Sequence, residues 1–140
     1  MSPKSAPPYL TSLGMPLART YGESAKPWLR ILQSYDDMVA ANSAFKPVSD
    51  LAHRLASSQF VSAGLCALTS HSDLLLGPST HVLDNPHLHI AYDFDQGRFL
   101  LTYLDGSAEP WSRTVEISDV LQAVSQFLIR EAGWFKQAGQ

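Results

Sequence analysis

The sequence has a single cysteine, Cys66, so no disulfide can form within the chain and nothing in it requires an oxidising compartment. Long apolar runs are also missing, and none approaches the roughly 20 residues that a membrane-spanning helix needs. The first residues carry prolines where a signal peptide would need a continuous apolar segment. From these absences we expect a soluble, cytoplasmic protein that does not insert into membranes.

Positive charge is scarce as well. Ten lysines and arginines stand against 13 aspartates and glutamates, for a net charge of −3. A chain without a basic excess is not concentrated on phosphate backbones, so we do not expect a nucleic-acid partner. Residues 60–110 hold six carboxylates and one arginine, Arg98, for a local net charge of −5. Concentrated negative charge of this kind favours a basic protein as the partner.

Signatures of known chemistry are absent too. The chain has no phosphate-binding glycine loop, no zinc motif and no Gly-x-Ser-x-Gly elbow. Ser70, His71, Ser72 and Asp73 contain the residue types of a hydrolase triad, but a working triad draws its members from separate elements so that the side chains converge. We therefore interpret this stretch as a turn, assign no catalytic residue and expect no cofactor.

The length and composition are typical of one folded domain. The chain has 140 residues, of which 45% are hydrophobic and 16% are charged. Residues 1–22 contain four prolines and two glycines, which interrupt regular backbone hydrogen bonding. We predict a flexible Pro-rich arm over residues 1–22 and a single α+β domain over residues 23–140. The arm has enough apolar side chains to dock on a surface, namely Tyr9, Leu10, Leu13, Met15 and Leu17.

Helical periodicity occurs before and after a central stretch of alternating residues. A first helix follows Pro27, and a second is expected to begin near Ser49 as its N-cap, with Lys46 and Pro47 in the turn between them. A last amphipathic helix is expected to begin at Ser118. It should end at Gly133, with Trp134 folded back on Ile129. The side chains expected to be buried in the first helix are Trp28, Ile31, Leu32, Tyr35, Met38 and Val39, and those in the last are Val120, Leu121, Val124, Phe127 and Leu128.

The central stretch predicts an antiparallel β-meander of four or five strands, covered by the last helix. Two short strands are expected around the Ser70–Ser72 turn. Alternation is clearest over residues 87–94, where every second side chain is large and apolar, so we expect one buried and one solvated face. The expected core residues of this strand are Leu88, Ile90, Tyr92 and Phe94.

Gln96 and Gly97 predict a two-residue turn after this strand, because glycine supplies the positive φ that such a turn needs. This turn would place Phe94 opposite Phe99 and Ile90 opposite Tyr103. A three-residue loop would instead set Phe94 against Arg98. The two-residue turn is the predicted one because it pairs apolar side chains.

Two functions remain open. The first is a non-enzymatic protein-binding module of the adaptor or toxin-neutralising (immunity) type, which binds a basic partner through an acidic surface. Its expected contact residues are Asp93, Asp95, Asp105 and Glu109, which gather around one hairpin in the sequence.

The alternative is a small-molecule or metal-binding domain, possibly enzymatic. His87 and His89 lie two residues apart, so they should project from one strand face together with Asp93 as a metal ridge. The aromatic side chains Tyr92, Phe94, Phe99, Tyr103, Trp111 and Phe127 could instead line a pocket. Cys66 lies among apolar residues and is expected to be an unreactive part of the core. The oligomeric state is not predicted.

Overall fold

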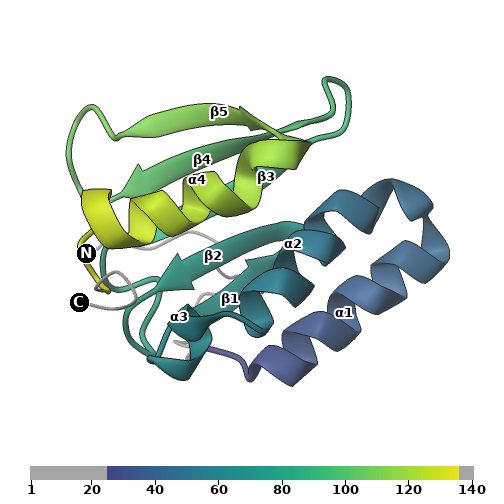
Figure 1. The fold of residues 1–140 in the computed structure, drawn as a ribbon, viewed down its shortest axis with the longest axis horizontal. Coiled ribbons are helices and arrows are strands. Elements are labelled where there is room, and N and C mark those ends of the chain that lie inside the picture. Colours follow the sequence, from purple (N-terminus) through teal and green to yellow (C-terminus); the bar gives the residue numbers. More distant parts are fainter. Residues whose placement is uncertain (1–24, 136–140) are drawn as a thin grey trace, which may run out of the picture.

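The computed structural model describes residues 25–135, so the predicted arm at residues 1–22 lies outside the described range. The fold is α+β, with three helices before a five-stranded sheet and one after it (Figure 1). The helices are Trp28–Ala41 (α1), Lys46–Ala56 (α2), Gln59–Ser62 (α3) and Val120–Gln126 (α4). The strands are Cys66–Ser70 (β1), Asp73–Gly77 (β2), His87–Asp93 (β3), Arg98–Leu104 (β4) and Ser112–Glu116 (β5).

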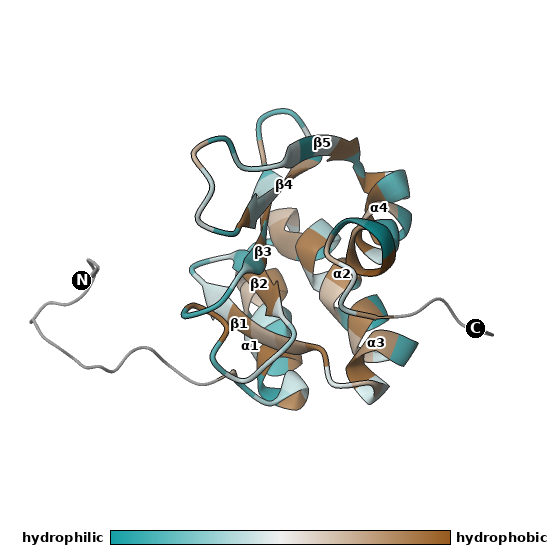
Figure 2. Cartoon of the chain, turned by 90° about the vertical axis from the view of Figure 1, so that its left-hand side faces the viewer, coloured by the Kyte–Doolittle hydropathy of each residue, from teal (hydrophilic) through white to brown (hydrophobic). Residues whose placement is uncertain are grey.

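The sheet is an antiparallel meander, as the sequence predicts. Its spatial order, β1-β2-β3-β4-β5, follows the chain, and each strand pairs with the next. Connections shorter than a crossover helix allow only antiparallel neighbours, which explains this order. The helices lie on one side of the sheet (Figure 2), so its two faces meet different surroundings.

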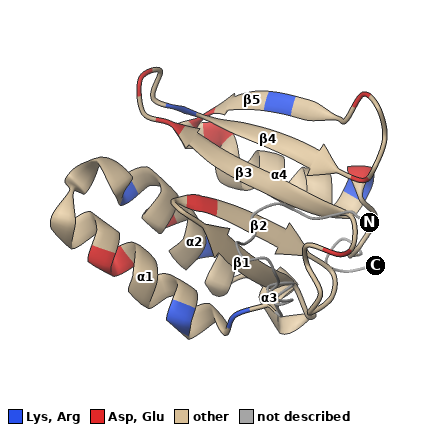
Figure 3. Cartoon of the chain, turned by 180° about the vertical axis from the view of Figure 1, so that it is seen from behind, with Lys and Arg blue, Asp and Glu red and all other residues tan. Residues whose placement is uncertain are grey.

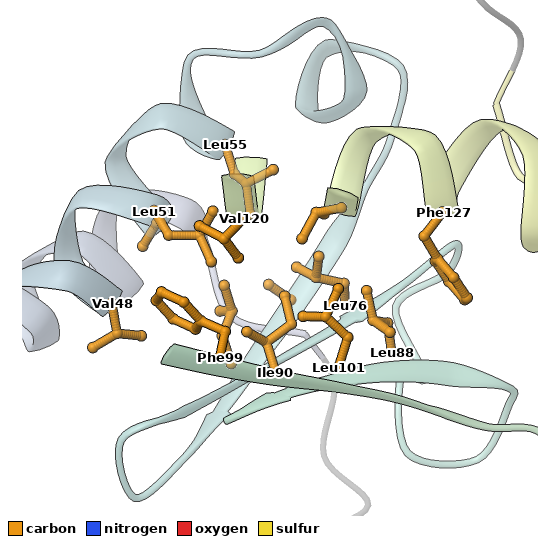
Figure 4. Close-up of a cluster of buried hydrophobic side chains, with 14 of the residues drawn as sticks. Val48, Leu51, Leu55, Leu76, Leu88, Ile90, Phe99, Leu101, Val120 and Phe127 are labelled. Atoms are coloured by element: carbon orange, nitrogen blue, oxygen red, sulfur yellow. The ribbon is translucent and has the colours of Figure 1, made fainter. Parts of the chain in front are cut away.

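The face of the sheet that meets the helices, called the inner face here, forms one wall of the core. Side chains from β2, β3 and β4 point from this face toward α2 and α4 (Figure 4). Because side chains alternate along a strand, every second residue contributes to this wall. Its fully buried members are Leu74, Leu76, Leu88, Ile90, Phe99 and Leu101, opposed by Val48, Leu51, Leu55, Val124 and Phe127 of the helical segments.

The helices before the sheet differ from the prediction. α2 begins at Lys46 and contains Ser49 as a buried residue, so Ser49 is not its N-cap. Pro47 lies in the first turn of α2, where backbone N–H groups have no partner within the helix, so the missing N–H of proline costs no helical hydrogen bond. The turn between α1 and α2 is instead organised by Asn42, whose side chain accepts a hydrogen bond from the N–H of Ala44 at 2.9 Å. The sequence analysis also missed the one-turn helix α3, which buries Phe60.

The segment after the sheet begins and ends in irregular turns. Ser118 lies within a short 3-10 turn, and no side chain caps it or α4, so the predicted cap is wrong. From Phe127 the helix widens to a π-helical turn, in which the N–H of Ala132 donates to the Phe127 carbonyl at 2.9 Å. Gly133 has a φ of 68°, and the N–H of Trp134 donates to the Leu128 carbonyl. The left-handed glycine ending is therefore as predicted.

The β3–β4 hairpin has a four-residue loop and not the predicted two-residue turn. Tyr92 pairs with Phe99 and Ile90 pairs with Leu101, a shift of two residues from the expected register. The Asp93 carboxylate accepts hydrogen bonds from the N–H groups of the next two loop residues, at 3.0 and 3.1 Å. Gly97, with a φ of 67°, donates its N–H to the Asp93 carbonyl.

The longer loop changes the position of Phe94. A shift of two residues keeps each side chain on its expected face, so Leu88 and Ile90 are buried as predicted. Phe94, in contrast, leaves the strand and is 45% exposed. Its ring packs edge-on against Phe45 and Tyr92, with centroids 5.2 and 4.9 Å away. The predicted core position of Phe94 is therefore wrong.

Replacing Phe99 with alanine should lower the free energy of unfolding by about 3 to 5 kcal/mol, because the ring is fully buried and leaves a cavity. Leu100→Ala is the matched control, since the neighbouring side chain points to the other face and is 42% exposed. We expect it to cost less than about 1 kcal/mol. Urea denaturation of both variants measures the difference. Equal losses, or a larger loss at Leu100, would show that β4 presents its faces the other way round.

Candidate functional site

The sheet face opposite the helices, called the outer face here, is covered over one half only. Over β1 and β2, the buried Val82 of the 78–86 loop packs on Leu68 and Leu75. Over β3 and β4, Leu100 and Leu104 remain 42% and 38% exposed. Figure 3 views the molecule from behind Figure 1 and shows this face. Candidate ligands from the sequence, His87, His89 and Asp93, belong to the same face of β3 by their alternation with buried residues.

His87 does not face solvent as predicted. It is only 8% exposed, and its Nδ1 lies 2.8 Å from the carbonyl oxygen of Asn85. Burial lowers the pKa of His87, an effect opposed by its hydrogen bond to Asn85 and strengthened by the neighbouring His89. The cause of the error is the 78–86 loop, which folds back over this end of the outer face and which strand periodicity cannot reveal.

His89 forms an unpredicted pair with Asp73. Its Nε2 lies 2.7 Å from Oδ2 of Asp73 on the adjacent strand β2, and both side chains are half-buried. The carboxylate orients the imidazole ring, as a partner does for a catalytic or metal-binding histidine. Asp93, the expected third member of the ridge, instead caps the hairpin loop. Sequence analysis did not find the pair because the two residues are 16 positions apart.

The metal ridge is not assembled as the sequence suggested. His87 and His89 each have one ring nitrogen bound to a neighbour, the Asn85 carbonyl or the Asp73 carboxylate. Across residues 25–135, no group of three or more histidine, cysteine, aspartate or glutamate side chains is arranged to hold a metal ion. The two histidines therefore do not form one site: His87 is buried beneath the 78–86 loop, and His89 lies at the margin of the part that this loop covers.

Ser70, His71, Ser72 and Asp73 form the turn that the sequence predicts. Ser70 pairs with Asp73 across the β1–β2 hairpin, and His71 has a φ of 57° at the tip. Below the turn, the buried Tyr35 of α1 donates its hydroxyl to the Ser72 carbonyl at 3.0 Å. Burial, and secondly the charge of Asp73, raises the pKa of Tyr35. The turn is thereby anchored to the helical layer.

The four acidic residues chosen from the sequence lie at opposite ends of β4. Asp93 and Asp95 are at the hairpin where β4 begins, and Asp105 and Glu109 are in the loop where it ends. At about 3.3 Å per residue, the two ends are about 20 Å apart. The single acidic cluster of the sequence is therefore two groups, one at each end of the open outer face.

Two of these acids have roles in their own turns. Besides Asp93, Asp105 accepts a hydrogen bond from the N–H of Ser107 at 3.0 Å. This bond lowers the pKa of the Asp105 carboxyl, which is fully exposed. The ion pairs found in the described part of the chain involve none of the four acids. Arg98 nevertheless lies directly opposite Asp93 in the β3–β4 register.

The predicted pocket aromatics pack on one another. Phe127 is buried between Tyr103 and Trp111, with ring centroids 5.0 and 4.9 Å away, and Trp134 closes the same cluster. At the other end of the sheet, Tyr92 contacts Phe99. Cys66 is half-buried against the cluster of Leu68, Leu75 and Val82, so it is not part of the main core as expected; burial raises the pKa of its thiol.

Comparison of the chain with protein-family models, curated proteins and solved structures finds no match. The helices between residues 25 and 135 include none with the length and apolar character to cross a membrane. The outer face over β3 and β4, with acids at both ends and the Asp73–His89 pair at its margin, is the candidate functional site.

Replacing His87 with glutamine should make stability less dependent on pH. In wild type the unfolded chain takes up a proton as the pH falls through about 6.5, while the buried folded imidazole resists protonation, so stability falls with pH in this range. The amide of H87Q does not titrate, so its unfolding free energy should fall less between about pH 7.5 and about pH 5.

The control is Gln33→Ala on the exposed surface of α1, which removes no titratable group and should retain the wild-type pH dependence. Chemical denaturation at each pH measures the difference. A pH dependence in H87Q as steep as that of wild type would contradict a neutral, buried His87.

Proposed function

We propose that this protein is a non-enzymatic binding module that contacts a basic protein through the outer face over β3 and β4. The observation that carries the proposal is the pair of exposed leucines, Leu100 and Leu104, on a sheet face that bears carboxylates at both ends. An adaptor or a toxin-neutralising protein of the cytoplasm fits this description. A free thiol, Cys66, is compatible with that reducing compartment.

The apolar part of the face supports contact with a protein. Antiparallel sheets with one solvated face usually carry polar residues there. In β4 the outward positions hold Arg98, Leu100, Thr102 and Leu104, and Leu100 pairs across the sheet with Ala91 of β3. An apolar patch bordered by polar groups is characteristic of interaction surfaces.

The acidic ends support a basic partner. A partner that covers the length of β4 would approach Asp93 and Asp95 at one end and Asp105 and Glu109 at the other. Charges at the margin of an interface mainly accelerate encounter and suppress wrong partners, while the apolar centre supplies most of the affinity. In this proposal the leucines of β4 supply most of the affinity, and the carboxylates of the flanking loops accelerate encounter.

The Asp73–His89 pair supports a second candidate, a small-molecule or metal-binding site that is possibly enzymatic. A carboxylate-oriented imidazole at the margin of an accessible face resembles a general base or a metal ligand in its local geometry. His89→Gln separates the candidates, because it removes the base and the ligand yet leaves Leu100 and the acids in place. Binding of a protein partner should survive this change, whereas a histidine-dependent reaction or bound metal should be lost.

Affinity capture with the tagged full chain from its native host tests the leucine patch. Wild type should retain a stoichiometric protein, and Leu100→Glu should lose it, because a charge would be buried at the centre of the contact. The matched control is Leu29→Glu on α1, where the side chain is 69% exposed and distant in sequence from the sheet. Equal capture by wild type and L100E would remove the outer face from the proposal.

Reversing charge at both ends of β4 should slow association with the captured partner. For Asp95→Lys/Glu109→Lys, the association rate at low salt should fall by about tenfold and depend less on ionic strength. Asp37→Lys, on the exposed surface of α1, is the charge control and should change the rate little. The measurement is the association rate against salt concentration, with circular dichroism to confirm folding. Rates that are equal in all three proteins would show that the acids do not steer the partner.

A further inference from the structure

The described chain begins on the outer side of the sheet. Ala25 packs against the cluster of Leu68, Leu75 and Val82 that covers the outer face of β1 and β2. Its N–H donates to the Thr80 carbonyl at 2.7 Å, and the N–H of Lys26 donates to Ala67 of β1 at 2.9 Å. The residues before Ala25 therefore depart from the covered half of the same face whose other half is open.

The preceding segment is long enough to reach the open half. The β2 and β4 strands are two strand spacings apart, about 10 Å. About three extended residues cover this distance, and 24 residues precede Ala25. Tethering also gives the segment an effective concentration of order millimolar at the face, which favours even a weak contact.

The composition of the segment complements the open half of the outer face. Residues 1–24 include Lys4 and Arg19 against one acid, Glu23, opposite a face with carboxylates at both ends. The apolar residues, Tyr9, Leu10, Leu13, Met15 and Leu17, match a face that exposes Leu100 and Leu104. Repeated prolines favour extended backbone, which can lie along a sheet surface without needing hydrogen-bond partners.

We propose that residues 1–24 of the same chain dock across the outer face over β3 and β4 and are its resident occupant. The segment is favoured by its charge, its apolar side chains and its length, and by the position of Ala25 on the outer side of the sheet. The proposal does not depend on the binding of another protein. If a basic partner uses the same face, the segment competes with it, and the partner must displace it.

Paramagnetic relaxation in the full chain tests the docking. Cys66→Ser removes the native thiol and keeps a hydroxyl that can donate to the Gly64 carbonyl, as the thiol does. Ser12→Cys then carries a nitroxide label among the apolar residues of the segment. In ¹⁵N-labelled protein, the amides of Ala91, Leu100 and Thr102 should be broadened, and those along α1 should not.

The leucine patch should be required for this broadening. Each leucine that the segment covers contributes about a tenfold factor to the ratio of docked to free chains. Leu100→Glu should therefore greatly reduce the broadening at Ala91 and Thr102. The milder Leu100→Thr should reduce it partly and preserves a good strand residue. The control Leu29→Glu, on α1, should leave it unchanged.

Two results in the single protein would overturn the proposal: no selective broadening on β3 and β4, or broadening that persists unchanged in both Leu100 variants. A third would be broadening in a mixture of nitroxide-labelled protein without ¹⁵N and ¹⁵N-enriched protein without the nitroxide. The last would identify a second copy as the occupant. Failure here is distinguishable from failure of the proposed function, because capture of a partner that is lost in L100E would still support partner binding.

Discussion

The hydrogen bonds of the Asp93 carboxylate in the β3–β4 loop set the register on which the rest of the sheet depends. By accepting two loop N–H groups, this side chain stabilises a four-residue connection that Gly97 completes in a left-handed conformation. The register then places Ile90 opposite Leu101 and Tyr92 opposite Phe99. A slip by one residue would turn every core side chain of one strand toward solvent. The same turn therefore decides both what α2 and α4 cover and what the outer face presents.

Because the helices cover the inner face, part of the outer face can stay uncovered without loss of the core. The inner face supplies the large contiguous core, with helices from both ends of the sequence packed on it. On the outer face, the 78–86 loop and Ala25 cover β1 and β2 through Val82, and the loop also covers the His87 end of β3. Beyond His87, β3 and β4 pack on the core from the inner side. Substitutions at their outward positions can therefore alter the outer face while the core remains packed, because the two faces are separated by the thickness of one strand layer.

The sequence predicted those parts of the fold that depend on local periodicity, and it failed where distant contacts decide. Alternation correctly identified β3 and its buried Leu88 and Ile90. The left-handed end of the last helical segment could be predicted from a single residue, Gly133. The hairpin register was missed because strand alternation is unchanged by a two-residue shift. Burial of His87 depends on a loop that folds back, and the Asp73–His89 contact joins separate strands. The acids appeared to be one cluster because they are close in sequence, although a full strand separates them in space.

The four acids also differ in how freely their charge can act on a partner. Asp93 and Asp105 each accept backbone N–H groups within their own turns, so changing them alters loop geometry together with charge. Asp95 and Glu109 accept no hydrogen bond through their side chains within residues 25–135. A substitution there therefore changes the local electrostatic potential with little effect on the backbone. The sequence cannot make this distinction, since all four are exposed carboxylates in loops or at strand ends. In the proposed binding of a basic partner, electrostatic steering would therefore come from Asp95 and Glu109, one at each end of β4, with Asp93 and Asp105 fixing the loops that carry them.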